Sequence, residues 1–229
     1  MTHRKKYKGV IFDFNGVLFW DDAIQRESWR SFSKQLRYKP LSDEEIDLHV
    51  HGRNNKHTIE YLLGKPVSQA QSDEYGEQKE TIYRQMCLGL GDDFALSPGA
   101  VNLLEKLSDQ RLPFTIATAS QKVNVDFFWE HLKLDTWFRL ENIVFNDGKT
   151  PGKPAPDLFL RAARKLEIAP EFSIVVEDSQ AGIQAAHRAG IGYLVALGPK
   201  AKHDQLIQLE GVNQVIETLA EISVENLLI

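Results

Sequence analysis

Several polar residues stand where short apolar runs end, or in the loops beside them, and together they could transfer a phosphoryl group. The first is Asp13, the last are Glu177 and Asp178, and between them lie Thr118 and Lys153. Carboxylates bind hard divalent cations such as Mg²⁺, whereas a hydroxyl and an ammonium group bind phosphate oxygens. A further carboxylate could act as a nucleophile. This combination is typical of phosphoryl transfer, in which positioning and charge neutralisation do most of the catalysis.

Each of these residues also has a simpler structural interpretation. Asp178 and Ser179 could cap a helix, and Lys153 could be an exposed charge in a loop rich in proline and glycine. In a parallel sheet, however, strand ends meet at one edge, and ligands bind just beyond the carboxyl ends of the strands. Placement of all these groups at separate strand ends therefore favours a joint chemical role.

The elements that would position these residues alternate between strands and helices. Apolar runs predict strands near residues 10–12, 113–118, 143–145, 173–176 and 193–197, with amphipathic helices between them and a short strand and helix at the tail. Such alternation indicates an α/β fold with a parallel sheet covered by helices on both faces.

Residues 20–95 interrupt this alternation, since they contain helical patterns and no convincing strand. Apolar residues at helical spacing predict a helix through about Tyr38, Ser42 and Glu45 form a capping-box pattern, and a long helix is expected from Ser68 to Leu88. We therefore expect a discontinuous core of residues 1–19 and 96–229, with an inserted all-helical domain at 20–95.

Composition narrows the functional class. The 229 residues carry a formal charge of −5, which argues against non-specific nucleic-acid binding. The single cysteine, Cys87, excludes an internal disulfide. We expect no membrane span or signal peptide, and a cytoplasmic protein that is a monomer or weak dimer, with a small phosphorylated substrate as its partner.

Four segments carry a resemblance that covers nearly the whole core. They are residues 13–17 (Asp-Phe-Asn-Gly-Val), 118–120 (Thr-Ala-Ser), 152–157 (Gly-Lys-Pro-Ala-Pro-Asp) and 177–183 (Glu-Asp-Ser-Gln-Ala-Gly-Ile). In this order they resemble the motifs of the haloacid dehalogenase superfamily, in the subgroup with a helical cap inserted after the first strand. The last two segments are similar to those of β-phosphoglucomutases and sugar-phosphate phosphatases. The resemblance implies a Rossmann-like core and a Mg²⁺ cofactor.

The resemblance also implies roles for individual residues. Asp13 would be the nucleophile that forms an aspartyl-phosphate, and Thr118 and Lys153 would bind the phosphate. The metal would be held by Asp13, Asp178, Glu177 and the backbone carbonyl of Asn15. Ala119 and Ser120, next to Thr118, would contact the substrate.

Asn15 departs from the family pattern, which has an aspartate there that protonates the leaving oxygen and later activates water. An amide cannot donate and recover a proton in this way. Losing such help costs about 10²–10⁴ in rate, and substrates with good leaving groups, such as acyl or aryl phosphates, would suffer least in the first step. Asp21 or Asp22 could compensate, although a helix N-cap and a first-turn acid are the favoured interpretations.

The helical segment argues against a mutase and leaves other activities open. Gln25 stands where those mutases have a hinge histidine, and Asn55 stands near their cap arginine, with Arg53 and Lys56 close by. These three cap residues could contact an anionic substrate. Alternatives to a phosphatase are a phosphonate hydrolase that uses Lys56 as a Schiff base, and a binding protein that has lost turnover. Haloacid dehalogenases, which use no metal, are disfavoured because Glu177 and Asp178 could bind one.

Overall fold

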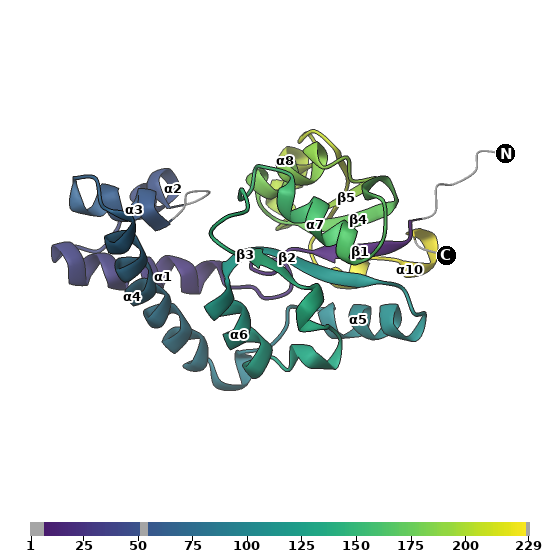
Figure 1. The fold of residues 1–229 in the computed structure, drawn as a ribbon, viewed down its shortest axis with the longest axis horizontal. Coiled ribbons are helices and arrows are strands. Elements are labelled where there is room, and N and C mark those ends of the chain that lie inside the picture. Colours follow the sequence, from purple (N-terminus) through teal and green to yellow (C-terminus); the bar gives the residue numbers. More distant parts are fainter. Residues whose placement is uncertain (1–6, 51–54, 228–229) are drawn as a thin grey trace. The chain divides into compact units, whose positions relative to one another are not determined.

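The computed structural model describes residues 7–50 and 55–227 of the chain. The chain divides into two compact units, one formed by Met1–Trp20 with Ala95–Ile229 and the other by Asp21–Phe94 (Figure 1). In the described part of the chain, no helix is both long enough and apolar enough to cross a bilayer.

The larger unit is built on a six-stranded sheet in the order β3-β2-β1-β4-β5-β6, with every neighbouring pair parallel. Chain order reverses around β1, which is where doubly wound sheets open a crevice for ligands. The predicted α/β fold with a Rossmann-like parallel sheet is confirmed. The strands are β1 (Gly9–Phe12), β2 (Phe114–Gln121), β3 (Val144–Asn146), β4 (Ser173–Glu177), β5 (Tyr193–Leu197) and β6 (Val212–Ile216).

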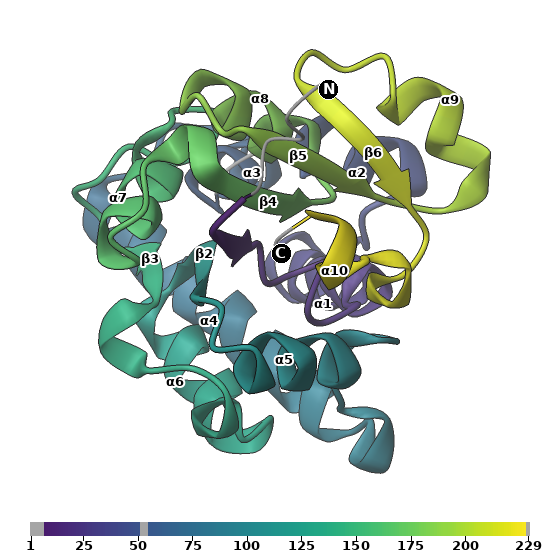
Figure 2. The ribbon, with the colours of Figure 1, turned by 90° about the vertical axis from the view of Figure 1, so that its right-hand side faces the viewer.

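Helices cover both faces of this sheet. In Figures 1 and 2, α7 and α8 lie on one face, and α5, α6 and α10 lie on the other. The helices are α5 (Ala100–Asp109), α6 (Lys122–His131), α7 (Asp157–Lys165), α8 (Gln180–Arg188), α9 (His203–Leu206) and α10 (Val224–Leu227). Single 3₁₀ turns occupy Leu134–Thr136, Leu140–Asn142, Pro170–Phe172, Lys200–Lys202 and Leu219–Glu221.

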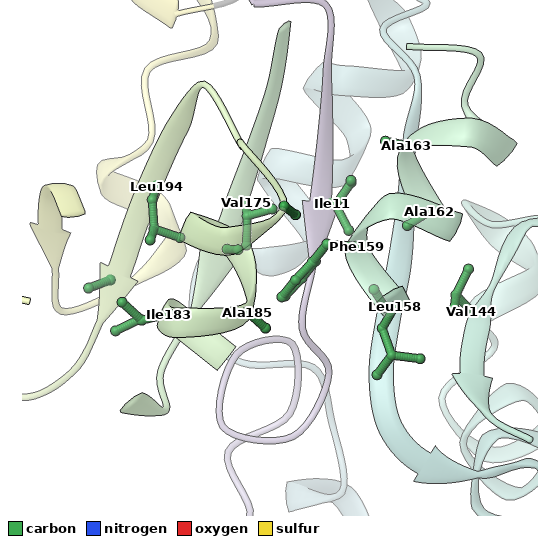
Figure 3. Packing of buried hydrophobic residues seen from close by; sticks show 14 of the residues in the cluster. Ile11, Val144, Leu158, Phe159, Ala162, Ala163, Val175, Ile183, Ala185 and Leu194 are labelled. Carbon is green, nitrogen blue, oxygen red and sulfur yellow. The ribbon is translucent and has the colours of Figure 1, made fainter. Parts of the chain in front are cut away.

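One apolar cluster fixes α7 and α8 against the sheet. Ile11 and Val175, from the central strands, meet Phe159 of α7 and Ile183 of α8, and all four are fully or almost fully buried (Figure 3). Alanines on the same helices keep the contact close. Burying each large side chain stabilises the fold by about 1.5–3 kcal/mol, so β1 and β4 are held rigidly at the centre of the unit.

The smaller unit contains α1 (Asp22–Arg37), α2 (Asp43–His49), α3 (Asn55–Leu63), α4 (Gln69–Leu88) and a 3₁₀ turn at Gly91–Asp93. The predicted capping box at α2 is confirmed: Glu45 N donates to Ser42 Oγ at 3.1 Å, and Ser42 N donates to Glu45 Oε2 at 2.8 Å. Ser68 and Gln71 start α4 in the same way. Trp29, Phe32 and neighbouring apolar residues form the unit's core.

Polar side chains are also buried in the smaller unit. Asp21 stands at the N-cap position of α1 as predicted, but its side chain makes no capping hydrogen bond to a backbone N–H of that helix. Instead it accepts hydrogen bonds from the Tyr83 hydroxyl at 2.6 Å and from Gln25 Nε2 at 3.0 Å. The predicted N-cap position is therefore confirmed, but the carboxylate bonds to Tyr83, 62 positions away, and does not cap the helix.

Candidate active site

Asp13 directly follows β1 at the carboxyl edge of the sheet. Its backbone N–H donates to Val176 O at 3.0 Å, which continues the pairing of β1 with β4 by one residue. The residue is only 6% exposed. The Asp13 backbone is therefore fixed at the end of β1, the strand around which the chain order reverses.

Lys153 joins the ends of β1 and β4. Its Nζ lies 2.5 Å from Asp13 Oδ1 and 2.5 Å from Glu177 Oε1, and the Phe159 ring centroid lies 5.1 Å away. All three charged side chains are at least nine-tenths buried. One ammonium group thus bridges two carboxylates from separate strands, which fixes the position of each.

Burial and these neighbours perturb the acid–base properties of the site. Burial is the main reason that the pKa of Asp13 rises to about 7; Lys153 opposes this rise and Glu177 adds to it. Burial alone would lower the pKa of Lys153, but the two carboxylates outweigh it and raise that pKa. The lysine therefore stays charged at neutral pH, whereas burial makes the charged form of Asp13 less favourable.

Three carboxylates form a candidate metal centre. Asp13, Glu177 and Asp178 each offer one oxygen, and these oxygens lie within 4.8 Å of one another. With all three ionised, one lysine leaves a net charge of −2, which a divalent cation would neutralise. Hard oxygen donors are the ligands that Mg²⁺ prefers. The donor set and its charge therefore fit the expected Mg²⁺.

Two glycines make room for these acids. A Cβ on Gly182 would stand 1.7 Å from Glu177 Oε1, and a Cβ on Gly16 would stand 2.0 Å from Asp178 Oδ2. Gly16 also has φ +81°, a conformation that favours glycine. Both positions therefore exclude any larger side chain unless the carboxylates move.

Asn15 is tied to the end of β2. Ser120 Oγ donates to Asn15 Oδ1 at 2.7 Å, and Ser120 N donates to Thr118 Oγ1 at 3.1 Å. Thr118 is buried, Ser120 is half-buried and Ala119 is exposed. The structure thus links the residue two positions after Asp13 to the segment proposed to hold phosphate.

The loop that carries Lys153 is anchored at both ends. Asp147 accepts hydrogen bonds from Thr150 N at 2.7 Å and from Arg161 Nη1 at 2.8 Å, which ties the loop's start to α7. Arg188 Nη1, from α8, donates to Pro154 O at 3.0 Å. These contacts restrict the loop before any ligand arrives.

The remaining predicted site residues belong to the helical unit. Asn55 opens α3, and its Nδ2 donates to Glu80 Oε1 at 3.2 Å. Lys56 follows it and is partly exposed. Arg53 lies outside the described residues.

Sequence reasoning missed several supporting residues. Ser179 is a helix cap, since its Oγ accepts from Gly182 N at 3.0 Å, but its backbone N–H also donates to Glu177 Oε2 at 2.7 Å. Nothing in the sequence indicated Phe159 or Arg188. Gly182 was the one feature of the sequence that could have indicated the close approach of another side chain, here that of Glu177.

Comparison with known proteins places the chain in a family. The haloacid dehalogenase-like hydrolase family matches residues 10–196, so the chain belongs to that family. A crystal structure of a HAD hydrolase, family IA, variant 3, from Entamoeba histolytica is 39% identical, covers 96% of both chains and superposes with a TM-score of 0.90.

Two curated relatives have more specific names. A phosphorylated carbohydrates phosphatase of Thermotoga maritima is 26% identical over 80% of this chain and 82% of its own length. The β-phosphoglucomutase of Bacillus subtilis is 27% identical over 83% of each chain. The expected membership of the superfamily, in the β-phosphoglucomutase-like subgroup, is confirmed.

Proposed function

We propose that this protein is a Mg²⁺-dependent phosphatase that hydrolyses a small phosphorylated metabolite through an aspartyl-phosphate on Asp13. The observation that carries the proposal is the buried Lys153 bridge between Asp13 and Glu177, with Asp178 beside it. This cluster combines a nucleophile, a fixed cation and a set of hard metal ligands. The names of the curated relatives, which include phosphatases of phosphorylated carbohydrates, support the same activity.

The residues divide the work as follows. Asp13 attacks phosphorus, and the bond between phosphorus and the leaving oxygen breaks. Lys153 and Thr118 hold the phosphoryl oxygens, one by charge and one by its hydroxyl. Mg²⁺, held by Asp13, Asp178, Glu177 and the Asn15 carbonyl, would neutralise charge on the transferring group. Asn15 offers an amide where relatives of the family use a carboxyl group, so low turnover is part of the proposal.

We assign substrate selectivity to the helical unit. Its candidate contacts are Arg53, Asn55 and Lys56, which offer two cations and an amide for an anionic substrate. Single replacements of Arg53 or Lys56 by methionine should raise KM more than they lower kcat, because a contact that binds the ground state and the transition state equally changes binding and not the chemical step. Loss of kcat alone after replacing Lys56 would instead favour the phosphonate hydrolase alternative.

A screen of phosphomonoesters tests the proposal. The protein, the Asn15→Asp variant and the Asp13→Asn variant would be assayed with Mg²⁺ and with a chelator. We expect slow, Mg²⁺-dependent release of phosphate by the protein, faster release by Asn15→Asp and none by Asp13→Asn. No release by either of the first two proteins would refute the phosphatase. Release by Asn15→Asp alone would favour a phosphometabolite-binding protein.

A further inference from the structure

The loop that follows Asp13 is tied to a serine from a distant part of the chain. Ser97 Oγ donates to Val17 O at 2.6 Å, and Ser97 N donates to Leu18 O at 2.8 Å. Ser97 is 4% exposed, and Val17 and Leu18 are fully buried. The chain returns to the larger unit at Ala95, two residues before this serine. Ser97 therefore joins two segments of the larger unit that are separated in sequence by the whole helical unit.

Backbone hydrogen bonds close the same loop into one compact turn. Leu18 N and Phe19 N both donate to Phe14 O, at 2.9 and 3.0 Å. Gly16 N donates to Phe19 O at 2.7 Å. Because these bonds connect the turn to itself, they fix its shape, whereas the two bonds from Ser97 fix its position within the larger unit.

This turn also carries groups that belong to the candidate metal centre. Asn15, two residues before Val17, offers the backbone carbonyl that is the proposed main-chain ligand. Gly16 stands against Asp178, since a Cβ on this glycine would lie 2.0 Å from Asp178 Oδ2. Peptide groups are planar and stiff, so a shift of Val17 is passed directly to the two residues before it. The position of Val17 therefore affects both the Asn15 carbonyl and the space available to the Asp178 carboxylate.

We propose that Ser97 is a positioning residue of the metal site, which holds the turn so that the Asn15 carbonyl and Asp178 can bind Mg²⁺ together. This inference rests on the proposed function, which requires that metal. Ser97 is not itself a ligand and acts only through the backbone of the turn. Replacing groups that orient metal ligands typically lowers metal affinity by about 10–100-fold. For the loss of one hydroxyl we expect the lower end of this range.

Metal binding in the absence of substrate tests the inference. Mn²⁺ takes the same oxygen ligands as Mg²⁺, and electron paramagnetic resonance would measure free Mn²⁺ during a titration, with Mg²⁺ as the competitor. Ser97→Ala removes the hydroxyl that donates to Val17 O, and the Kd for Mn²⁺ should rise about 10-fold. Circular dichroism would check that the variant is folded. If it is not, Ser97→Cys, whose thiol is a weaker donor of similar size, carries the same prediction.

Ser33→Ala is the matched control, because Ser33 is also a buried serine with two hydrogen bonds. In the helical unit it donates to Arg30 O and accepts from Leu41 N, both at 2.9 Å. Its replacement should lower stability and leave the Kd for Mn²⁺ unchanged.

The outcomes separate the inference from the function on which it rests. An unchanged Kd in Ser97→Ala, or an equal rise in Ser33→Ala, would overturn the role of Ser97 and leave the proposed function standing. Absence of Mn²⁺ binding by the parent protein, or binding that Asp178→Asn leaves unchanged, would overturn both.

Discussion

Each unit of the protein contains a buried lysine. Both lysines lie beside an aromatic ring and contact at least one carboxylate. Lys153, in the larger unit, has a side chain 7% exposed with an aromatic ring 5.1 Å from its Nζ. Lys79, in the helical unit, is 2% exposed and lies 5.2 Å from the Trp29 ring. What separates them is the charge that each one faces.

Lys153 faces two carboxylates at 2.5 Å with a third acid nearby, whereas Lys79 contacts one carboxylate, Glu80 at 3.1 Å, and the neutral Gln25 Oε1 at 2.7 Å. The Lys79–Glu80 pair balances its own charge within α4, and Lys79 connects α4 to α1 through Gln25. The cluster around Lys153 has excess negative charge at the edge of a parallel sheet, where it can bind a cation and, with the cation, a phosphate. Burial of a lysine therefore does not by itself mark an active site.

The largest effect that distinguishes the two lysines is expected in catalysis. Lys153→Met should lower kcat/KM by about 10²–10³, since it removes a preorganised charge from the transferring group. It also removes the group that lowers the pKa of Asp13, so less of the nucleophile is ionised at neutral pH. Steady-state assays with 4-nitrophenyl phosphate would measure this. Lys149→Met, an exposed position in the same loop, is the matched control and should keep its rate.

Lys79→Met should act on stability instead. It leaves the carboxylate of Glu80 buried without its cation, which costs about 3–5 kcal/mol in the free energy of unfolding. Urea unfolding would measure the loss, and adding Glu80→Gln to the variant should recover part of it. Lys65→Met, which removes an exposed lysine of the same unit, should be nearly neutral. A Lys79→Met protein as stable as the parent would show that neither the Glu80 pair nor the Gln25 contact of Lys79 stabilises the unit.

The next test concerns the room around Glu177. In Gly182→Ala, a Cβ in ideal geometry stands 1.7 Å from Glu177 Oε1, so the buried carboxylate must move. We expect a loss of about 1–3 kcal/mol in stability, together with weaker Mg²⁺ activation. In the helical unit, Gly76→Ala meets only Asn55 Nδ2 at 3.6 Å, and a neutral or slightly stabilising effect is expected. Similar losses in both variants would contradict the account.

The smallest effect is expected from pH acting on the helical unit. Hydrogen bonding from Ser42 N, together with Arg37 and Tyr61, lowers the pKa of Glu45 to about 2. A lowered folded-state pKa adds stability above the ordinary glutamate value, and that stability is lost as pH falls toward 2. Glu45→Gln should therefore destabilise the protein by about 1 kcal/mol at pH 7. The difference in melting temperature between the two proteins should shrink at pH 3; a constant difference would be contrary evidence.

The strand ends were the predictable part of this site. Asp13 directly follows an apolar run, and Glu177 and Asp178 follow another. Lys153 stands in a segment of glycine and prolines, so local pattern alone indicated that these residues meet at one edge. The same patterns predicted the capping box at Ser42, because its two partners are three residues apart. Local spacing was sufficient wherever the contact is local or follows from the topology of a parallel sheet.

Long-range polar contacts were not predictable in this way. Lys79 stands within a helix, where a lysine ordinarily faces solvent, and only the packing of α1 against α4 shows that Gln25 and Glu80 bury it. Local pattern indicated only that Asp21 caps a helix. It could not show the hydrogen bond from Tyr83, which is 62 positions away in the sequence. The Ser120 contact that orients Asn15 spans 105 positions. Such contacts depend on side-chain directions that no periodicity encodes.

The proposed mechanism requires that Asp13 becomes phosphorylated. The protein would be mixed with acetyl phosphate and Mg²⁺, quenched in acid, digested and examined by mass spectrometry. On the proposed slow hydrolysis, we predict one added phosphoryl group on Asp13, removable by hydroxylamine and absent from Asp13→Asn. Phosphorylation at another residue, or turnover of acetyl phosphate by Asp13→Asn at the rate of the parent protein, would contradict the account.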